Sequence, residues 1–461
     1  MTETLVQPTA LPAPAPAELA SIEPRVLELG RQLGRRQRTL RATGRGAYDK
    51  AMNLLSSDPE LRAALFRLVD VAPACASTPE LAEHLAAYLD DVENEALPVG
   101  LGKGAADSKL FGRATGRVAS SMVKQMAGRF IVGESIADAE PTLRKLWSNG
   151  VAATVDLLGE ATVTHAEGEA YAARCEDALR ALAAATARWP RQPLLEADSV
   201  GPLPRVNLSV KVTALTPLTR AEAPERARED AARHLRRLLR QAKELGAHLH
   251  VDMESMDSRE LILDLVLDLL EEPEFADGPS AGMVLQAYLR DCEDLLDRIL
   301  ERTAAAGRSV PLTVRLVKGA YWDHETIEAA QHGWEPPVWT EKAESDRCFE
   351  RASRRLIDAF PLVRTAIASH NLRSVAHAVS YADAAGLARG DLELQVLRGL
   401  GDELQDSLAA AGLRCRTYCP VGDLVAGMAY LVRRLLENTS NASFLASQAG
   451  GADAEELLRA P

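Results

Sequence analysis

From residue 140 onward, short runs of β-branched and other apolar residues alternate with longer segments whose apolar positions recur at spacings of three and four. The eight runs fall at 150–158, 205–212, 247–253, 281–289, 311–319, 364–370, 392–397 and 415–421. Such runs are typical of strands, and the segment after each run has the spacing of an amphipathic helix. Eight strand–helix units in about 300 residues predict a closed (β/α)8 barrel. An open doubly wound sheet usually has a glycine-rich turn after its first strand, and the sequence has no such turn.

The part of the chain before the barrel has a different pattern. Residues 25–139 show helical spacing only, interrupted by prolines and glycines, so we expect an all-helical N-terminal region. Residues 1–24 are rich in Pro and Ala and predict a disordered tail with no signal peptide. The barrel is expected to span 140–446 and a C-terminal tail 447–461. The glycines of 97–108 lack the spacing of a phosphate-binding loop and predict a linker.

Composition narrows the function classes. The formal net charge is −13, which argues against nucleic acid as a partner, because phosphate-binding domains present basic surfaces. The six cysteines form no CxxC pair and predict reduced, buried thiols in a cytoplasmic protein. The sequence contains no run of eighteen apolar residues, so it predicts no membrane-spanning helix. Peripheral contact at the inner face of the membrane is compatible with the sequence.

In a (β/α)8 barrel the site lies at the carboxyl ends of the strands. The polar residues expected there are Asp156, Lys211, His250, Asp252, Glu254, Gln286, Arg290, Arg315, Lys318, His370, Asn371, Gln395 and Tyr418. Lys211 and Asp252 interrupt apolar runs, and a buried charge is costly unless it is paired or functional. A purely structural Lys211–Asp252 ion pair is therefore the alternative to a binding site.

One interpretation of the barrel mouth is a metal-dependent hydrolase. Period-two alternation in HLHVDME places four candidate ligands on one face of a strand: His248, His250, Asp252 and Glu254. His370 offers a further ligand. Against this interpretation, the HxH pair is on the third strand, whereas such hydrolases resemble one another in carrying it on the first. Arg315 and Lys318 on the fifth strand would also weaken the binding of a divalent cation.

The second interpretation is a site for an anionic cofactor and an anionic substrate. VRLVKG places Arg315 and Lys318 on opposite faces of the fifth strand, and Gly319 lets the backbone approach a ligand closely. Lys211 adds a third cation to the same mouth. A cationic mouth in an acidic protein favours negatively charged ligands.

The stretch YLVRRLLENTSN adds two adjacent arginines, Arg433 and Arg434, in an otherwise apolar helix. A solvated face with an i,i+4 pair between Arg433 and Glu437 would explain them at a few tenths of a kcal/mol. A clamp for a small carboxylate is the alternative, since guanidinium groups bind carboxylates in a bidentate manner.

Eight stretches occur in order along the barrel: SVKVTAL, HVDMES, LQAYLRD, VRLVKGAYWD, ASHN, LQVLRGLG, TYCPVG and YLVRRLLENTSN. In these stretches the chain resembles the proline dehydrogenase domain of bacterial proline utilization A flavoproteins, and the N-terminal region shows the resemblance more weakly. The resemblance implies a distorted, TIM-like (β/α)8 barrel that holds FAD. We expect this FAD to bind without a covalent bond, because no histidine or cysteine is placed for attachment. It also implies that the last helix lies over the barrel mouth instead of beside its strand.

The resemblance implies the oxidation of L-proline to Δ1-pyrroline-5-carboxylate, the first step of proline catabolism to glutamate, with electrons passing from flavin to a membrane quinone. The implied catalytic residues are Asp252 and Arg315. The implied substrate-binding residues are Lys211, Leu397, Tyr418, Arg433, Arg434 and Glu437. The implied FAD-binding residues are Met253, Gln286, Arg315, Lys318, Gly319, Ala320, Ser369, His370 and Gln395.

The chain also departs from the familiar bifunctional members of this family. They carry an aldehyde dehydrogenase domain after the barrel, which acts on the product, whereas this sequence ends at Pro461 without that enzyme's cysteine motif. We therefore expect either a monofunctional version or a piece of a longer protein. The Pro/Ala-rich N-terminus predicts no gene-regulatory role. A barrel that serves only as a scaffold is the non-enzymatic alternative, and such a protein would be colourless.

Overall fold

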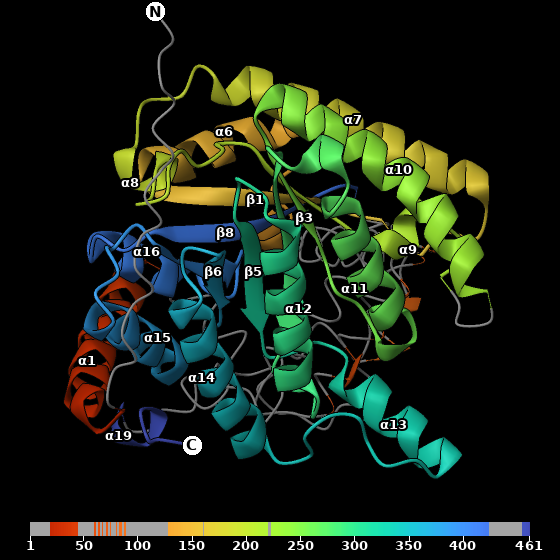
Figure 1. Cartoon of the computed structure of the whole chain (residues 1–461). Coiled ribbons are helices and arrows are strands. Elements are labelled where there is room, and N and C mark those ends of the chain that lie inside the picture. The colour runs from red at the N-terminus through yellow and green to blue at the C-terminus, as the bar shows by residue number, and fades with distance from the viewer. Residues whose placement is uncertain are drawn as a thin grey trace, which may run out of the picture.

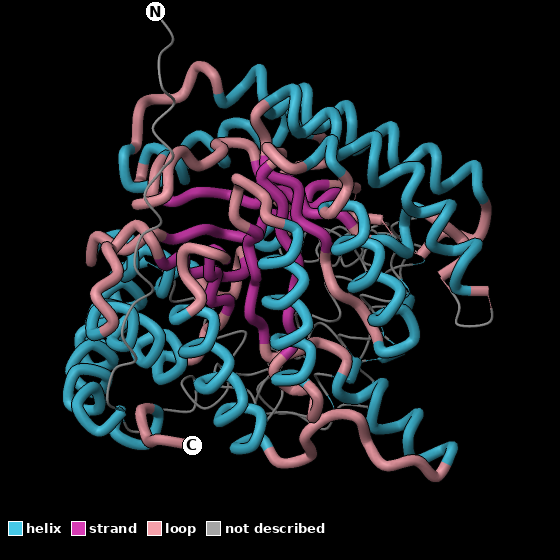
Figure 2. Tube along the Cα trace, viewed as in Figure 1, coloured by secondary structure: helices cyan, strands magenta, loops and turns pink. Residues whose placement is uncertain are grey.

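Eight parallel strands close into a barrel in the computed structural model of the chain. The structure describes residues 19–44, isolated positions between 60 and 88, and residues 128–159, 161–219, 223–423 and 454–461. Each strand pairs with the next along the chain, and β1 pairs with β8 to close the barrel. Figure 1 and Figure 2 show the strands at the centre with helices packed around them. The expected (β/α)8 fold is confirmed.

Each of the eight predicted runs overlaps a strand. The strands are β1 Val151–Leu157, β2 Asn207–Val210, β3 His248–Val251, β4 Ser280–Gln286, β5 Leu312–Val317, β6 Val363–Ala368, β7 Leu392–Leu397 and β8 Cys415–Val421. The runs at 392–397 and 415–421 agree with β7 and β8 to the residue. The second and third runs are longer than β2 and β3, because their last residues leave the sheet to build the barrel mouth.

Helices follow the strands as the apolar spacing predicts. Those of the barrel are α7 His165–Thr186, α8 Pro193–Glu196, α9 Val212–Leu215, α10 Pro224–Leu245, α11 Met256–Leu270, α12 Cys292–Ala306, α13 Trp322–His332, α14 Lys342–Asp358, α15 Leu372–Ala384 and α16 Asp402–Ala410; η3 Pro273–Phe275 is a single 3-10 turn, and α6 Ile136–Ser148 precedes β1. Helix α7 begins at a capping box, in which Thr164 and Glu167 satisfy each other's backbone N–H groups. Helix α10 ends at Gly246, whose φ of 60° is the left-handed conformation that glycine adopts most easily.

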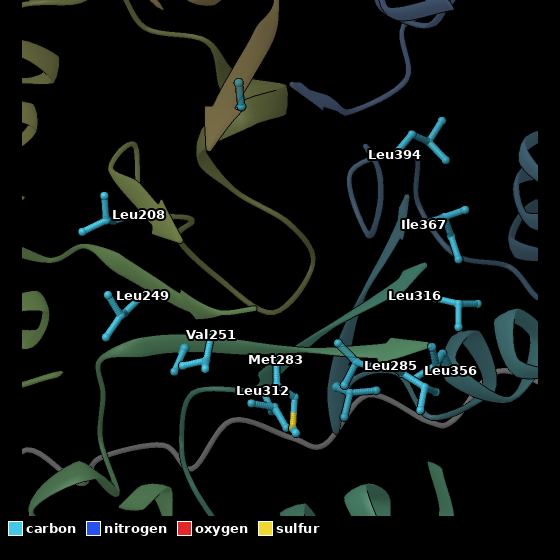
Figure 3. Packing of buried hydrophobic residues seen from close by; sticks show 14 of the residues in the cluster. Leu208, Leu249, Val251, Met283, Leu285, Leu312, Leu316, Leu356, Ile367 and Leu394 are labelled. Carbon is cyan, nitrogen blue, oxygen red and sulfur yellow. The ribbon is translucent and has the colours of Figure 1, made fainter. Parts of the chain in front are cut away.

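The apolar core lies between the strands and the helices. Leu208, Leu249 and Met283 are fully buried members of it, and Figure 3 shows them with their neighbours. Successive residues of a strand point to opposite faces of the sheet. The residues next to Leu208, Leu249 and Met283 in the sequence therefore face the barrel interior. Ser209 and His250 are two of those interior residues. The interior of this barrel is therefore largely polar, and its side chains must satisfy one another.

Helix α1, Leu19–Gly44, packs on α15 and α16 (Figure 1). It begins inside the predicted tail 1–24, so the prediction was wrong for residues 19–24. The physical reason is burial: Ile22 and Val26 are buried, which offsets the loss of a backbone donor at Pro24 within the helix. Most of the expected helical region 25–139 lies outside the described residues.

The last described segment, residues 454–461, returns to α1. It contains α19, Ala454–Leu457. The buried side chain of Leu458 packs directly on Gly30 of α1, where a Cβ would lie 2.2 Å from it. Arg373 of α15 donates to the carbonyl of Leu458 and to Glu23 of α1. The end of the predicted C-terminal tail is therefore folded against the N-terminal helix.

Among the described residues, no helix is both long and apolar enough to cross a membrane. The five described cysteines are buried and form no disulfide: Cys175, Cys292, Cys348, Cys415 and Cys419. Those five agree with the expectation of reduced, buried thiols, and Cys75 lies outside the described residues.

Candidate active site

Asp252 is the centre of a hydrogen-bonded cluster at the barrel mouth. Its Oδ1 accepts from Ser209 Oγ at 2.6 Å and from Arg315 Nη1 at 2.8 Å. Its Oδ2 accepts from Tyr418 OH at 2.6 Å and from Lys211 Nζ at 3.4 Å. Arg315 and Tyr418 belong to β5 and β8, which are not neighbours of β3 in the sheet, so these contacts cross the barrel interior. The predicted residues Lys211, Asp252, Arg315 and Tyr418 are thus brought together.

Lys211 lies between two carboxylates. Its Nζ is 2.6 Å from Asp156 Oδ1 and 3.4 Å from Asp252 Oδ2. Burial by itself would lower the pKa of Lys211, but the two carboxylates more than offset it and raise that pKa well above its usual value. Lys211 is therefore charged at neutral pH. An ammonium group has three donors, and described residues accept two of those of Lys211, so one remains for a ligand within the part of the chain that the structure describes.

The electrostatic balance of the cluster also explains why Asp252 is ionised. Burial would raise the pKa of Asp252, but Lys211 and Arg315 lower it below its usual value. Asp156 differs, because its burial is the larger effect and raises its pKa in spite of Lys211. One carboxylate is thus held firmly as an anion beside two cations, which keeps both cations in place.

Arg315 has donors that no described residue accepts. Its side chain is 5% exposed, and its guanidinium lies 5.4 Å from the centroid of the Tyr418 ring. Nη1 donates to Asp252, but Nε and Nη2 are buried and have no hydrogen-bond partner among the described residues. Unsatisfied buried donors are costly, so this arrangement indicates a ligand that accepts hydrogen bonds.

The loops after β2 and β3 are tied together beneath Lys211. Glu254 accepts from the side chain of Thr213 at 2.6 Å and from its backbone N–H at 3.2 Å. Gln286, at the end of β4, donates to the Glu254 carbonyl at 3.2 Å. Thr162, after β1, donates to the Thr213 carbonyl. The loops after β1 and β3 therefore hold the turn that carries Lys211, and the end of β4 supports them through the side-chain amide of Gln286.

The turn after β5 has a backbone that only glycine tolerates. Gly319 has a φ of 139°, and a Cβ there would lie 2.4 Å from the Tyr288 ring. Lys318 pairs with Asp346 of α14, and burial lowers the pKa of Lys318 although Asp346 opposes the shift. Ala320 is exposed. The predicted cofactor positions 318–320 thus form one rigid turn at the mouth.

Two further predicted residues shape the ends of β6 and β7. His370 Nε2 accepts from the backbone N–H of Leu397 at 3.0 Å, and Ser369 Oγ accepts from the N–H of Asn371 at 3.1 Å. His370 therefore holds Leu397 in place at the end of β7. Met253, next to Asp252, packs against the edge of the apolar core.

Gln395 is not part of the mouth cluster. Its amide donates to Glu393 at 2.6 Å, and it lines a small cavity deeper in the barrel. Gln395 precedes Leu397 by two residues and lies about 7 Å lower along the strand. Its assignment to the cofactor stays a prediction.

The histidines of HLHVDME lie deeper in the barrel than Asp252, because His250 precedes it by two residues and His248 by four along the same stretch of chain. His248 and His250 lie in the lower barrel, where His248 contacts Ser280 at 2.8 Å and His250 at 3.2 Å. Among the described residues, no group of three His, Cys, Asp or Glu side chains could hold a metal ion. The metal-dependent hydrolase interpretation is therefore not favoured.

Three predicted substrate-binding residues, Arg433, Arg434 and Glu437, lie outside the described residues. Two residues that the sequence reasoning missed are Ser209, which donates to Asp252, and Asp346, which pairs with Lys318. Ser209 alternates with the apolar residues of its strand, a pattern that marks an interior position. Asp346 lies within a helix, and no sequence pattern relates it to Lys318.

The buried histidines predict that acid destabilises the fold. Burial lowers the pKa of His248 to about 3, whereas the unfolded chain titrates at about 6.5. The unfolded state therefore binds more protons between these values, and stability falls by up to ~1.4 kcal/mol per pH unit as pH drops below 6.5. Urea denaturation at pH 7.5 and 5.5 measures this change. His248→Gln should show a smaller fall than the control His324→Gln on exposed α13, and equal falls would contradict the assignment.

A closed parallel barrel with paired charges at the carboxyl ends of its strands defines a TIM-barrel protein whose site lies at the mouth. Residues 139–447 match the family described as proline dehydrogenase, and residues 23–130 match the proline utilization A N-terminal domain. The first match covers more than half of the chain. The chain belongs to the proline dehydrogenase family.

Relatives of two lengths share this barrel. The bifunctional protein PutA of Salmonella typhimurium is 32% identical over 330 residues, which cover 70% of this chain and 24% of that protein. Proline dehydrogenase 1 of Bacillus subtilis is 27% identical over 320 residues, which cover 69% of this chain and 89% of that protein. The chain thus spans about a quarter of the bifunctional relatives it matches.

Solved structures agree with these relationships. The crystal structure of proline utilization A from Bdellovibrio bacteriovorus, inactivated by N-propargylglycine, is similar with a TM-score of 0.86 and 36% sequence identity. The similarity covers 95% of this chain and 44% of that chain. It therefore extends beyond the barrel to most of the sequence.

Proposed function

We propose that this chain is an FAD-dependent proline dehydrogenase that oxidises L-proline to Δ1-pyrroline-5-carboxylate and passes the electrons to a quinone. The observation that carries the proposal is the Asp252 cluster, in which Lys211 and Arg315 are held as cations at the mouth of a barrel of this family. The cluster offers one face to an anionic substrate and another to a cofactor that accepts hydrogen bonds.

The substrate would bind through its carboxylate. Lys211 has one donor left after its contacts with Asp156 and Asp252, and we propose that Arg433 and Arg434 complete the carboxylate site, with Glu437 orienting one guanidinium. Tyr418 is fixed by its hydrogen bond to Asp252 and, with Leu397, would pack on the proline ring. This arrangement would hold the ring in one orientation.

The residues present fit FAD. Arg315 has two buried nitrogens without an acceptor among the described residues, which a cofactor that accepts hydrogen bonds would satisfy, and Gly319 lets the Tyr288 ring pack directly on the backbone of the turn after β5. When bound, FAD would supply the hydride chemistry by accepting a hydride from the proline carbon next to nitrogen. Further contacts would come from Met253, Gln286, Lys318, Ala320, Ser369 and His370.

The cellular setting follows from the same proposal. A quinone acceptor resides in a membrane, so we propose a cytoplasmic protein that reaches the inner face of the membrane peripherally. The product would be a substrate for an aldehyde dehydrogenase. PutA relatives are named as bifunctional proteins, which is consistent with a second enzyme acting after the first.

Anaerobic reduction of bound flavin tests the proposal. The full chain, purified with FAD, should be yellow and should lose its flavin absorbance on addition of L-proline. A quinone or an artificial dye should then restore the absorbance, whereas NAD⁺ should not, since no dinucleotide-binding glycine turn follows a strand. Pyrrolidine, which lacks the carboxylate, should reduce the flavin far more slowly. Proline-dependent NADH formation by this chain alone, or failure to bind FAD, would refute the proposal.

A further inference from the structure

A second polar cluster fills the lower half of the barrel, below the Asp252 cluster, and the proposed activity does not use it. It surrounds a cavity of about 20 Å³, which is room for one particle of the size of a water molecule. The lining residues are Leu203, Pro204, Asn207, His248, His250, Ser280, Thr313, Arg364, Glu393, Gln395, Arg414 and Arg416. The three arginines among them are each 5% exposed or less.

Only two carboxylates lie within ion-pair distance of these three guanidinium groups among the described residues. Arg364 pairs with Asp198 through Nε at 2.6 Å, and Arg416 pairs with Glu393 through Nε at 2.9 Å. Arg414 approaches both carboxylates, at 3.8 Å from Asp198 and 3.5 Å from Glu393, but its Nε makes no hydrogen bond. The cluster therefore holds one positive charge more than its carboxylates balance.

Neighbouring groups do not remove this excess. Above it, Lys211 is paired with Asp156 and Arg315 with Asp252, and neither of these two carboxylates forms an ion pair with the three arginines among the described residues. The next carboxylate, Asp391, accepts from Ser199 and from the Ala388 N–H, and no ion pair joins it to the three arginines among the described residues.

The titratable groups of the cluster keep their charges fixed at neutral pH. Burial lowers the pKa of His248 to about 3 and that of His250 well below its usual value, so both histidines are neutral. Burial would raise the pKa of Glu393, but Arg416 and Arg414 lower it to about 2, so Glu393 is an anion. An uncompensated buried charge is costly, and a bound counter-ion would remove the cost.

Unpartnered polar atoms also indicate an occupant of the cavity. Arg414 Nε and His250 Nε2 are buried without a hydrogen-bond partner among the described residues. Arg414 Nε is always a donor. We infer that the cavity binds a halide ion, chloride in the cell, which compensates the excess positive charge of Arg364, Arg414 and Arg416. The cavity is too small for sulfate or phosphate, and its arginines exclude cations.

Bromide locates the ion directly. Crystals of the full chain, grown with bromide in place of chloride, should give an anomalous difference peak inside the cavity beside Arg414 and Arg416. A water molecule in the cavity, with no anomalous peak, would overturn the inference. This measurement does not depend on flavin or on activity, so it stands or falls separately from the proposed function.

Thermal unfolding tests the energetic role. Chloride and bromide should raise the Tm of the full chain in a saturable manner at constant ionic strength, whereas gluconate should not, because only an ion that binds the folded state at a site has a saturable effect on unfolding. Asn207→Asp, which is nearly isosteric, places a negative charge at the cavity and should abolish the halide effect. Asn149→Asp adds the same charge at the exposed end of α6 and should keep it.

The variants separate specific binding from general salt effects. Equal halide dependence in Asn207→Asp and Asn149→Asp would contradict the site. If Asn207→Asp does not fold, Gln395→Glu places the charge at another lining residue and should give the same loss of halide dependence.

Discussion

Replacing Asp252 with asparagine is expected to lower kcat/KM for L-proline by roughly 100-fold or more and to destabilise the fold by about 3–5 kcal/mol. Asp252 is the common partner of Lys211, Arg315, Tyr418 and Ser209. Without its charge, two buried cations lose an anion, and an amide offers only one acceptor where the carboxylate has two oxygens. Steady-state kinetics with L-proline and urea denaturation measure the two effects.

Two further variants identify the cause. Glu274→Gln removes a carboxylate that pairs with Arg240 on the exposed surface, and it should change neither activity nor stability. Tyr418→Phe removes one donor to Asp252 and should cost less than Asp252→Asn in both measurements. If Asp252→Asn keeps activity within about threefold of the wild type, which corresponds to less than 0.7 kcal/mol, Asp252 does not organise the site.

Replacing Arg315 with methionine is expected to weaken FAD binding by about 10- to 200-fold, the equivalent of one lost charge-assisted hydrogen bond of roughly 1.5–3 kcal/mol. The reason is that two buried nitrogens of Arg315 have no acceptor among the described residues and are free to bind the cofactor. Titration of the apoprotein with FAD, followed by flavin fluorescence, gives the dissociation constant without any turnover.

Arg315→Lys separates charge from geometry. Lysine keeps the ion pair with Asp252 but lacks the planar fork, so the lysine variant should fold normally and still bind FAD less tightly than the wild type. Arg298→Met removes an arginine that pairs with Glu260 on the outer surface and serves as the control. Unchanged FAD affinity in Arg315→Met, with a normal fold, would place the cofactor elsewhere.

The order and type of the barrel elements were predictable because they depend on local spacing. Alternation and short apolar runs indicated all eight strands, and the three-four spacing indicated the helices between them. Lys211 and Asp252 were recognisable as site residues, since charges within apolar strands are rare unless they are paired or functional. The family resemblance added roles for Arg315 and Tyr418 that spacing alone does not reveal.

The partners of these residues depended on the closure of the barrel. Asp252 meets Arg315 and Tyr418 across the interior, 63 and 166 residues apart in the chain, and no local pattern relates such distant positions. The sequence also did not determine how deep Gln395 lies in the barrel. That depth depends on how many residues separate Gln395 from the end of its strand, and the strand end is known only from the structure. The start of α1 inside the Pro/Ala-rich segment was decided by the burial of Ile22 and Val26.

By itself, therefore, the sequence determined the secondary structure, the barrel and the charged residues that interrupt its strands, because these follow from hydrophobic periodicity and from the cost of burying charge. Only the tertiary structure decided how the charges are balanced. It pairs the four charged groups of the mouth and leaves one guanidinium of the lower barrel in excess. Coulombic interactions depend on distances in space, and those distances exist only after the eight strands have closed.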